Sequence, residues 1–166
     1  MGAFEWRPDW VEIIGEQEQL LRYDSFTRET ALELGLKIIE LAKTTGWGNA
    51  AVRIIEDNAT IFAYKMPGTS EENDWWMSRK LAVARRAGCS SLRAYVEAES
   101  GLRKAFWEDR ADNYAPCGGC FPVLTTDGSA PWAYILVSGL AHYHDHQIIA
   151  DAIAWQLNKK IRSIAE

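Results

Sequence analysis

The sequence has little cysteine, little histidine and no surplus of positive charge, and each shortage narrows the class of protein. Its 166 residues include three cysteines and three histidines, and the formal net charge is −5 at pH 7. An odd, low cysteine count argues against a disulfide framework and favours free thiols in a reducing compartment. An acidic chain gives no reason to expect nucleic acid as a partner, because phosphates attract basic surfaces.

Long apolar runs and targeting patterns are missing as well. The longest uncharged segment, residues 128–144, contains Pro131, two serines and several histidines and tyrosines, so it is too polar to cross a bilayer. The first ten residues, MGAFEWRPDW, are interrupted by charges and lack the apolar core of a signal peptide. We therefore expect a cytoplasmic protein with no membrane partner.

The residues that are present predict one mixed domain. Apolar residues make up 48% and charged residues 25%, as in ordinary globular proteins. Apolar periodicity predicts short strands and helices in alternation, and an antiparallel sheet covered by helices, an α+β domain, accommodates them economically. The strands are expected over residues 50–56, 60–65, 121–126 and 132–138, and the helices over 8–22, between Thr27 and Gly46, from Asp74 to Gly88, from Ser90 to Gly101 and over 144–164.

All three histidines lie in one short segment, HYHDH, at residues 142–146. In an extended segment His142, His144 and His146 would share one face, as metal ligands spaced by two residues do. At the start of a helix only His142 and His146 would be neighbours, and the helix dipole would keep the rings neutral and favour Asp145 in the first turn. A polar first turn with exposed histidines and a metal site with at least two of them both stay open here.

Cys117 and Cys120 have the spacing of half a zinc site. A complete site needs four ligands, so two of the histidines at 142, 144 and 146 would have to complete it. The other interpretations are small residues in a Gly-Gly turn or a redox pair, although the helix that follows the first cysteine in thioredoxin-like units is missing. The chain has no GxSxG, GxxxxGK[ST] or GxGxxG motif, so no catalytic residue is assigned.

Basic and aromatic residues also form patterns. The basic stretch RKLAVARR, residues 79–86, is interpreted as a solvated helix face. Eight tryptophans are an excess for this length, and tryptophan is enriched at interfaces. Ile148 and Trp155 lie off the main apolar stripe of the last predicted helix, which suggests a second buried face and a subunit contact.

Three segments together match the pattern of one known family. They are GTSEENDWWMSRK at 68–80, GGCFPV at 118–123 and VSGLAHYHDH at 137–146. With these segments the chain resembles the GlcG-like family that carries the haem-degrading domain, and specifically its short, largely uncharacterised branch, over most of residues 17–160. The residues that fit the family pattern are Gly68, Thr69, Ser70, Asn73, Asp74, Trp76, Arg79, Lys80, Gly118, Gly119, Phe121, Pro122, Ser138, Gly139, Leu140, Asp145 and His146.

The resemblance implies a profilin-like fold, with three α/β/α layers around an antiparallel sheet of about five strands, and assembly into homo-oligomers. It implies a single domain over residues 1–166 in which residues 1–16 are a peripheral N-terminal extension. Some distant relatives bind haem. Cys117, Cys120, His142 and His144 depart from the pattern of the branch, so a metal site built from them would belong to this protein alone.

We therefore expect an oligomeric protein that binds a small molecule, haem among the candidates, rather than an enzyme. The ligand would lie between residues 68–80, the Gly-Gly turn and the start of the last helix. Two alternatives are kept: a surface-acting adaptor or assembly protein, and a metal-dependent enzyme or zinc-stabilised module that uses Cys117, Cys120 and His142, His144 or His146. The residues expected to bind the ligand are Gly68, Thr69, Asn73, Trp76, Lys80, Gly118, Gly119, Phe121, Ser138, Asp145 and His146.

Overall fold

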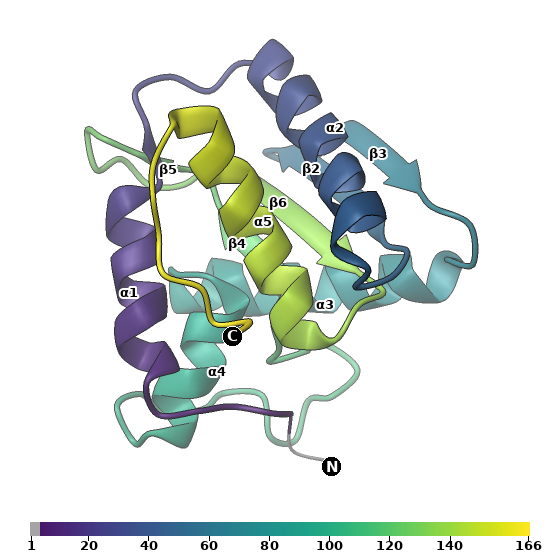
Figure 1. The fold of residues 1–166 in the computed structure, drawn as a ribbon. Helices are drawn as coiled ribbons and strands as arrows, with labels where there is room; N and C mark the ends of the chain where they lie inside the picture. The colour runs from purple at the N-terminus through teal and green to yellow at the C-terminus, as the bar shows by residue number, and fades with distance from the viewer. Residues whose placement is uncertain (1–3) are drawn as a thin grey trace.

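The computed structural model describes residues 4–166 and has helices on both faces of an antiparallel sheet (Figure 1). The expected α+β class and three-layer arrangement are confirmed. No helix within residues 4–166 is long and apolar enough to cross a membrane. In chain order the elements are α1 (Trp10–Leu20), β1 (Arg22–Tyr23), α2 (Arg28–Thr45), β2 (Ala51–Glu56), β3 (Ala59–Lys65), α3 (Glu71–Ala87), α4 (Ser91–Glu99), β4 (Cys120–Pro122), β5 (Leu124–Thr125), β6 (Ala133–Ser138) and α5 (His142–Leu157).

The main sheet has four strands in the order β3-β2-β6-β4, and every neighbouring pair is antiparallel. The resemblance implies about five strands, and the structure has these four in the main sheet with a separate pair, β1 and β5, beside it. The strand predicted at 121–126 divides into two. Its first part, β4, pairs with β6, which begins only at Ala133 and offers no partner beyond that point. The second part, β5, pairs in parallel with β1 instead. Pro122 is tolerated in β4 because an edge strand can lack one amide donor.

Alternation along the strands separates two apolar layers. Val52 and Ile54 of β2 face α2 and α5, whereas Ala51 and Ile55 face α3. Ile54 and Ile55 are neighbours in the strand and are both buried, on opposite faces, as the alternation requires. Helices therefore cover the sheet on both sides, and polar groups on the α3 side of β6 lie between that strand and α3.

Helix boundaries follow the capping residues. Thr27 caps α2, Gly46 ends it with φ of 74°, and Ser90 caps α4, all as predicted. The prediction that α3 begins at Asp74 is wrong, because Ser70 is the N-cap and the side chain of Asn73 accepts a hydrogen bond from the Ser70 amide.

The predicted span of α5, 144–164, is also corrected. The helix begins at His142 and ends at Leu157, because Asn158 adopts a left-handed conformation at its C-terminus. Residues 158–166 then run back beside α1 as a tail (Figure 1).

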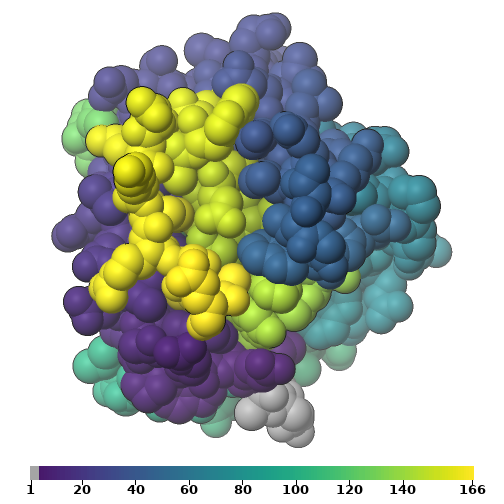
Figure 2. All heavy atoms as spheres, viewed as in Figure 1, coloured from purple at the N-terminus to yellow at the C-terminus, as the bar shows by residue number. Residues whose placement is uncertain are grey.

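The N-terminal segment and the C-terminal tail lie side by side on one face (Figure 2). Gln17 of α1 donates a hydrogen bond to the carbonyl of Arg162, and Arg7 donates one to the carbonyl of Glu166. Residues 1–3 of the expected N-terminal extension lie outside the described residues. The remainder is well packed, since Trp10 and Ile14 are buried against α4.

Candidate functional site

A pocket with a volume of about 380 Å³ opens where the start of α3, the Gly-Gly turn, the end of β6 and the start of α5 meet. The three family-like segments therefore converge in space, although residues 80 and 145 are far apart in the chain. Five of the residues expected to bind a ligand line this pocket: Asn73, Trp76, Lys80, Ser138 and Asp145.

An ion pair forms the floor of the pocket. The Nζ of Lys80 lies 2.9 Å from Oδ2 of Asp145 and 2.9 Å from the carbonyl oxygen of Val137, and both charged side chains are only 3% exposed. The amide of Leu140 donates to the other carboxylate oxygen. Burial raises the pKa of Asp145 to about 6 against the opposing effect of Lys80. Burial acts to lower the pKa of Lys80, but Asp145 outweighs it and raises the value, so both groups are charged at pH 7.

The Gly-Gly turn lets the backbone reach this floor. A Cβ on Gly119, which has φ of +127°, would lie 2.4 Å from the carbonyl oxygen of Val137 and 2.6 Å from Nζ of Lys80. A Cβ on Gly118 would lie 2.1 Å from the carbonyl oxygen of His142. Backbone therefore comes close to other groups in this turn, and any side chain at either position would displace the ion pair or the start of α5.

Polar side chains continue the pocket above the ion pair. Asn73, in the first turn of α3, donates from Nδ2 to the hydroxyl oxygen of Ser138 at 3.0 Å. Its Oδ1 accepts from the amide of Ser70 at 2.9 Å as part of the helix cap. Capping and site formation thus use the same side chain, which fixes the position of the amide that faces the pocket.

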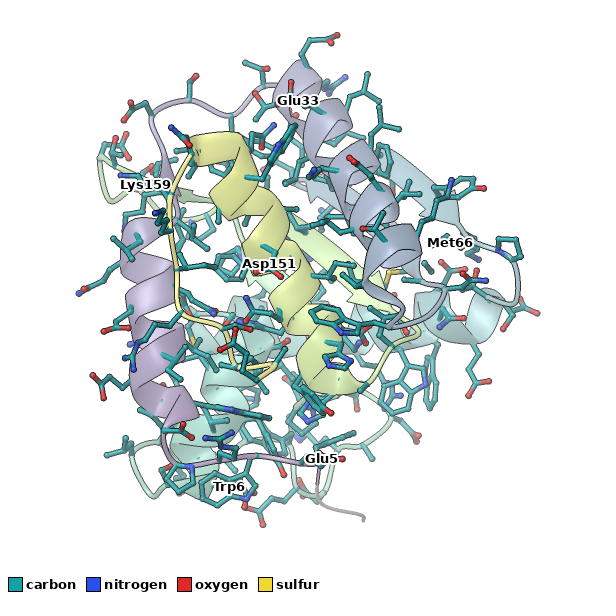
Figure 3. The ribbon with its side chains drawn as sticks, in the orientation of Figure 1. Glu5, Trp6, Glu33, Met66, Asp151 and Lys159 are labelled. Atoms are coloured by element: carbon teal, nitrogen blue, oxygen red, sulfur yellow. The ribbon has the colours of Figure 1, made fainter. Side chains whose placement is uncertain are left out.

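His142 closes one side of the pocket as a neutral ring. Its Nδ1 accepts from the amide of Gly118 at 3.0 Å, so the proton is on Nε2, which donates to the carbonyl oxygen of Glu5 at 2.7 Å. Burial lowers the pKa of His142 to about 4. Figure 3 shows Glu5 in the N-terminal segment beside the first turn of α5. The same segment places the ring of Phe4 in the pocket wall, 5.2 Å from that of His142.

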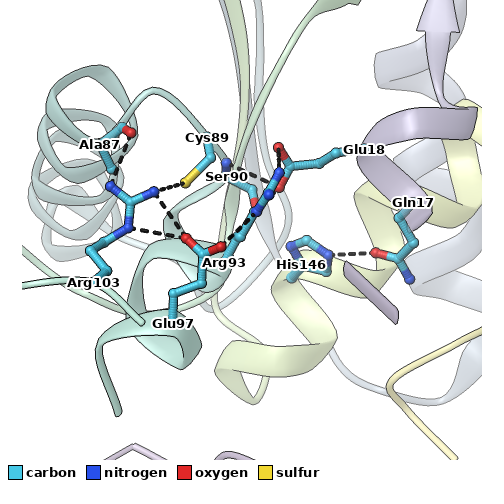
Figure 4. A network of polar contacts seen from close by, with 9 residues as sticks. All are labelled: Gln17, Glu18, Ala87, Cys89, Ser90, Arg93, Glu97, Arg103 and His146. Carbon is cyan, nitrogen blue, oxygen red and sulfur yellow. Dashed lines mark hydrogen bonds and ion pairs between the residues drawn. The ribbon is translucent and has the colours of Figure 1, made fainter. Parts of the chain in front are cut away.

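The other two histidines face away from the pocket. His146 is fully buried and its Nε2 lies 2.8 Å from Oε1 of Gln17 (Figure 4). Burial lowers the pKa of His146 to about 3. His144 stacks on the ring of Trp47 with 4.1 Å between centroids. The segment HYHDH is therefore the first turn of a helix, but the interpretation of exposed histidines is wrong.

The residues of the alternative metal site are not grouped as ligands in the structure. Cys117 and Cys120 are free, buried thiols, and burial raises the pKa of Cys117 to about 11 and that of Cys120 further, so both stay protonated at neutral pH. The histidines at 142, 144 and 146 are each held by a different partner. Within residues 4–166 no three side chains of His, Cys, Asp or Glu are grouped so that they could hold a metal ion.

Haem also lacks a fit to this pocket. Haem iron takes an axial ligand such as a histidine nitrogen or a thiolate. Both nitrogens of His142 have hydrogen-bond partners, Cys117 is a protonated thiol, and Asp145 already neutralises the charge of Lys80, which leaves no unpaired cation for a propionate. Among the pocket residues that the structure describes, none offers a free ligand to haem iron.

Several predicted residues support the site from outside the pocket lining. Gly68 turns the chain with φ of 90°, and the hydroxyl of Thr69 donates to the carbonyl of Met66, which together lead into α3. Phe121 belongs to the apolar core beside the ring of His146. None of these three lines the pocket, nor do the two glycines of the Gly-Gly turn.

The interpretation of residues 79–86 as a solvated face is wrong at its start. Lys80 is in the pocket floor, and Arg79 is buried with its guanidinium over the rings of Trp75 and Trp76. Sequence reasoning missed Phe4 and Glu72 in the pocket lining. Glu72 lies inside a segment already singled out, whereas nothing in the pattern near the N-terminus connects Phe4 to residues so far along the chain.

Comparison with known proteins places the chain in a family. Residues 26–154 match the family model described as haem degrading protein HbpS-like. A UPF0303 protein of Rhizobium johnstonii is 31% identical over 159 residues, which covers 94% of this chain and 96% of the relative. A UPF0303 protein of Azotobacter vinelandii is 33% identical over 161 residues, covering 93% of each.

Solved structures share the fold at lower identity. The crystal structure of the Ybr137w protein has 23% identity and a TM-score of 0.77 over 89% of this chain and 87% of that one. The crystal structure of a PduOC–haem complex has 15% identity and a TM-score of 0.61 over 78% and 94%. The resemblance drawn from three short segments is confirmed. The chain belongs to the HbpS-like family of haem-degrading proteins, and the family match spans every pocket residue except Phe4.

Proposed function

We propose that the protein binds a small organic molecule in the pocket between α3, the Gly-Gly turn and the start of α5. The observation that carries this proposal is the convergence of three distant segments around a cavity of about 380 Å³ with a buried ion pair at its floor. Ligand sites are typically concave, mostly apolar and furnished with a few fixed polar groups. A protein of the same fold was crystallised with haem. In this pocket no described residue offers a free ligand to haem iron, which favours a smaller ligand without a metal.

The state of the reactive groups favours binding over catalysis. His142 is held in one tautomer by two hydrogen bonds, and the thiol of Cys117 is protonated because its pKa is about 11. The amine of Lys80 is held as a cation by Asp145. A general base or nucleophile needs a pKa near the working pH or an activating partner. These three groups instead have fixed protonation states suited to orienting a ligand.

Two adjacent tryptophans provide a matched test. Trp76 lines the pocket, whereas Trp75 is 47% exposed and does not line it. We expect native mass spectrometry of untagged protein to detect a bound small molecule. Trp76→Ala should remove that mass and the thermal stabilisation it gives, and Trp75→Ala should retain both. Retention of the ligand by Trp76→Ala would place the binding site elsewhere.

We also propose that the protein forms a homo-oligomer through the outer face of α2 and α5. Leu32 and Leu36 of α2 are 46% and 55% exposed, and Trp155 of α5 is 49% exposed. Helices α2 and α5 pack against one another (Figure 1). Leu32 and Leu36 line one groove with the last turn of α5, and Lys37 of α2 lies over the ring of Trp155, so the exposed side chains share one surface. Exposed apolar clusters of this kind are enriched at contacts between protein chains. Of the two residues set off from the stripe of α5, Ile148 is buried and Trp155 supplies the exposed surface.

Light scattering tests the oligomer. Trp155→Glu puts a charge into the proposed contact, and we expect the measured mass to fall to that of a smaller species. Leu102→Glu is the control, because Leu102 is 67% exposed and lies outside α2 and α5. An unchanged mass for Trp155→Glu, or the same loss for both variants, would contradict an interface on this face.

A further inference from the structure

A chain of hydrogen bonds with a fixed direction leads from the cap of α3 into the pocket. The amide of Ser70 can only donate, so the atom of Asn73 that it meets at 2.9 Å is the side-chain oxygen. The nitrogen of Asn73 must then donate to the hydroxyl oxygen of Ser138, 3.0 Å away. Since that oxygen is the acceptor in this bond, the hydroxyl proton of Ser138 is left to donate elsewhere.

The hydroxyl of Ser138 is a buried donor at the pocket wall. The residue is 4% exposed and lines the cavity. Among the residues that the structure describes, no oxygen or nitrogen accepts its proton in a hydrogen bond. A buried donor without an acceptor is costly, which makes the pocket the natural source of a partner.

Lys80 supplies a second spare donor next to the first. Its ammonium group carries three protons, and the carbonyl of Val137 and the carboxylate of Asp145 accept two of them. The carbonyl that Lys80 meets belongs to Val137, the residue before Ser138 in β6, and both Lys80 and Ser138 line the pocket. The inner end of the pocket therefore presents two donors, and a ligand atom that meets both must be an acceptor.

The charge balance of the site selects among acceptors. Asp145 already neutralises Lys80, the ring of His142 is uncharged, and Glu72 adds a negative charge to the lining. An anionic ligand would be buried without a counter-charge of its own, at a large desolvation cost. A neutral oxygen accepts the same two hydrogen bonds without that cost. The remaining walls, from Phe4, Trp76 and Leu140, are apolar and suit a flat body.

This inference rests on the proposed binding function. We propose that the pocket selects small, flat, uncharged molecules that carry a carbonyl-type oxygen, which accepts hydrogen bonds from the hydroxyl of Ser138 and the ammonium group of Lys80. Ser138 and Lys80 contact the ligand, and Asn73 is a positioning residue that sets the direction of the Ser138 proton.

Three probes of one size test the ligand class at pH 7. Acetophenone is an uncharged acceptor, benzoate an anionic acceptor and benzylamine a cationic donor. Titrations of isotope-labelled protein, followed by NMR at the amides of Gly139 and Leu140 and at the indole of Trp76, measure each affinity. We expect acetophenone to bind about tenfold more tightly than either charged probe, from the cost of burying an unpaired charge.

Two variants test the direction of the hydrogen-bond chain. Ser138→Ala removes the donor, and we expect acetophenone to bind roughly three- to tenfold more weakly, the effect of one neutral hydrogen bond. Asn73→Asp keeps an acceptor for the amide of Ser70 but draws the Ser138 proton toward itself, so it should weaken acetophenone by a similar factor with the hydroxyl still present. Ser78→Ala removes an exposed hydroxyl of α3 outside the pocket lining and should change nothing.

Each result separates this inference from the broader proposal. If benzoate or benzylamine binds the same residues as tightly as acetophenone, the ligand class is wrong and the binding function stands. If Asn73→Asp binds acetophenone as the wild type does, the directed chain is wrong. If no probe shifts a pocket residue, the ligand class is overturned. If, in addition, native protein carries no small molecule in the Trp76 experiment, the binding function falls with it.

Discussion

Two buried carboxylates join helices in this protein, and each pairs with a cation from another helix. Asp145 of α5 meets Lys80 of α3 at 2.9 Å, and Glu18 of α1 meets Arg93 of α4 at 3.4 Å. Burial raises the pKa of both carboxyl groups, against the cations and the hydrogen-bond donors around them. The two pairs thus begin from the same physical problem, a negative charge removed from water.

Their surroundings solve that problem differently. Glu18 accepts from the amide and the hydroxyl of Ser90 as well as from Arg93, and Arg93, itself 35% exposed, also pairs with Glu97 (Figure 4). Lys80 and Asp145 stay enclosed and face a cavity, with one ammonium proton unused by the protein. Burial of a charge therefore does not by itself mark a functional site. A donor left over beside a cavity does distinguish the pocket pair.

The largest expected effect comes from removing one cation of each pair. Lys80→Met leaves Asp145 buried and unpaired and should lower the free energy of unfolding by about 3–5 kcal/mol. Arg93→Met should cost about 1 kcal/mol, because its side chain is 35% exposed and Glu18 keeps both donors of Ser90. Urea denaturation at pH 7 measures both values.

A double variant controls for lost packing around the amine. Lys80→Met combined with Asp145→Leu removes both charges and should recover most of the lost stability, because no unpaired charge remains. Equal losses for Lys80→Met and Arg93→Met would show that the two pairs do not differ in the way described.

Local parts of this comparison were predictable from the sequence. Thr27 and Ser90 cap their helices because a side-chain oxygen next to an apolar run satisfies nearby amides, which is a matter of a few residues. The start of α3 was misplaced because Ser70, Asn73 and Asp74 are all good capping residues. Only the folded chain decides that Ser70 caps the helix while Asn73 also reaches Ser138.

Contacts between residues far apart in the sequence were predictable only in outline. The family pattern named Lys80 and Asp145 without indicating that they pair, and nothing in the sequence connected Glu18 with Arg93. The three histidines share a short segment, yet the helix directs their side chains apart. They contact Glu5, Trp47 and Gln17, which come from separate parts of the fold. Partner choice depends on which elements pack together, and periodicity carries no such information.

The pH dependence of stability gives a third test of the pocket, through His142 in its wall. Its pKa is about 4 in the folded protein and near 6.5 when unfolded, so between these values the unfolded chain binds a proton that the folded protein does not. Stability from this residue is therefore full above pH 6.5 and is lost as the pH falls through 4, by up to about 1.4 kcal/mol per pH unit. Asp145 acts in the opposite direction, because its folded pKa of about 6 is raised and protonation relieves it.

His142→Gln isolates the histidine, since an amide accepts from Gly118 and donates to Glu5 without titrating. Lys80 and Asp145, the charged groups near the ring, are the same in both proteins, and so is the buried His146. We expect the wild type to lose stability more steeply than His142→Gln between pH 6.5 and 4 in urea denaturation. Parallel curves would mean that this ring is free to take up a proton in the folded state.

The smallest expected effect compares two helix caps of the same type. Ser70 caps α3 beside the pocket and Thr27 caps α2 away from it, and the amide of each cap residue donates to the side chain of the third helical residue. Ser70→Ala and Thr27→Ala should each cost about 1 kcal/mol in urea denaturation, because each removes one side-chain acceptor from a helix start. Neither should change binding of a pocket ligand, since Asn73 is oriented by the backbone amide of Ser70, which alanine retains. Weaker binding confined to Ser70→Ala would show that the cap hydroxyl, and not the backbone amide, holds the donors of the pocket in place.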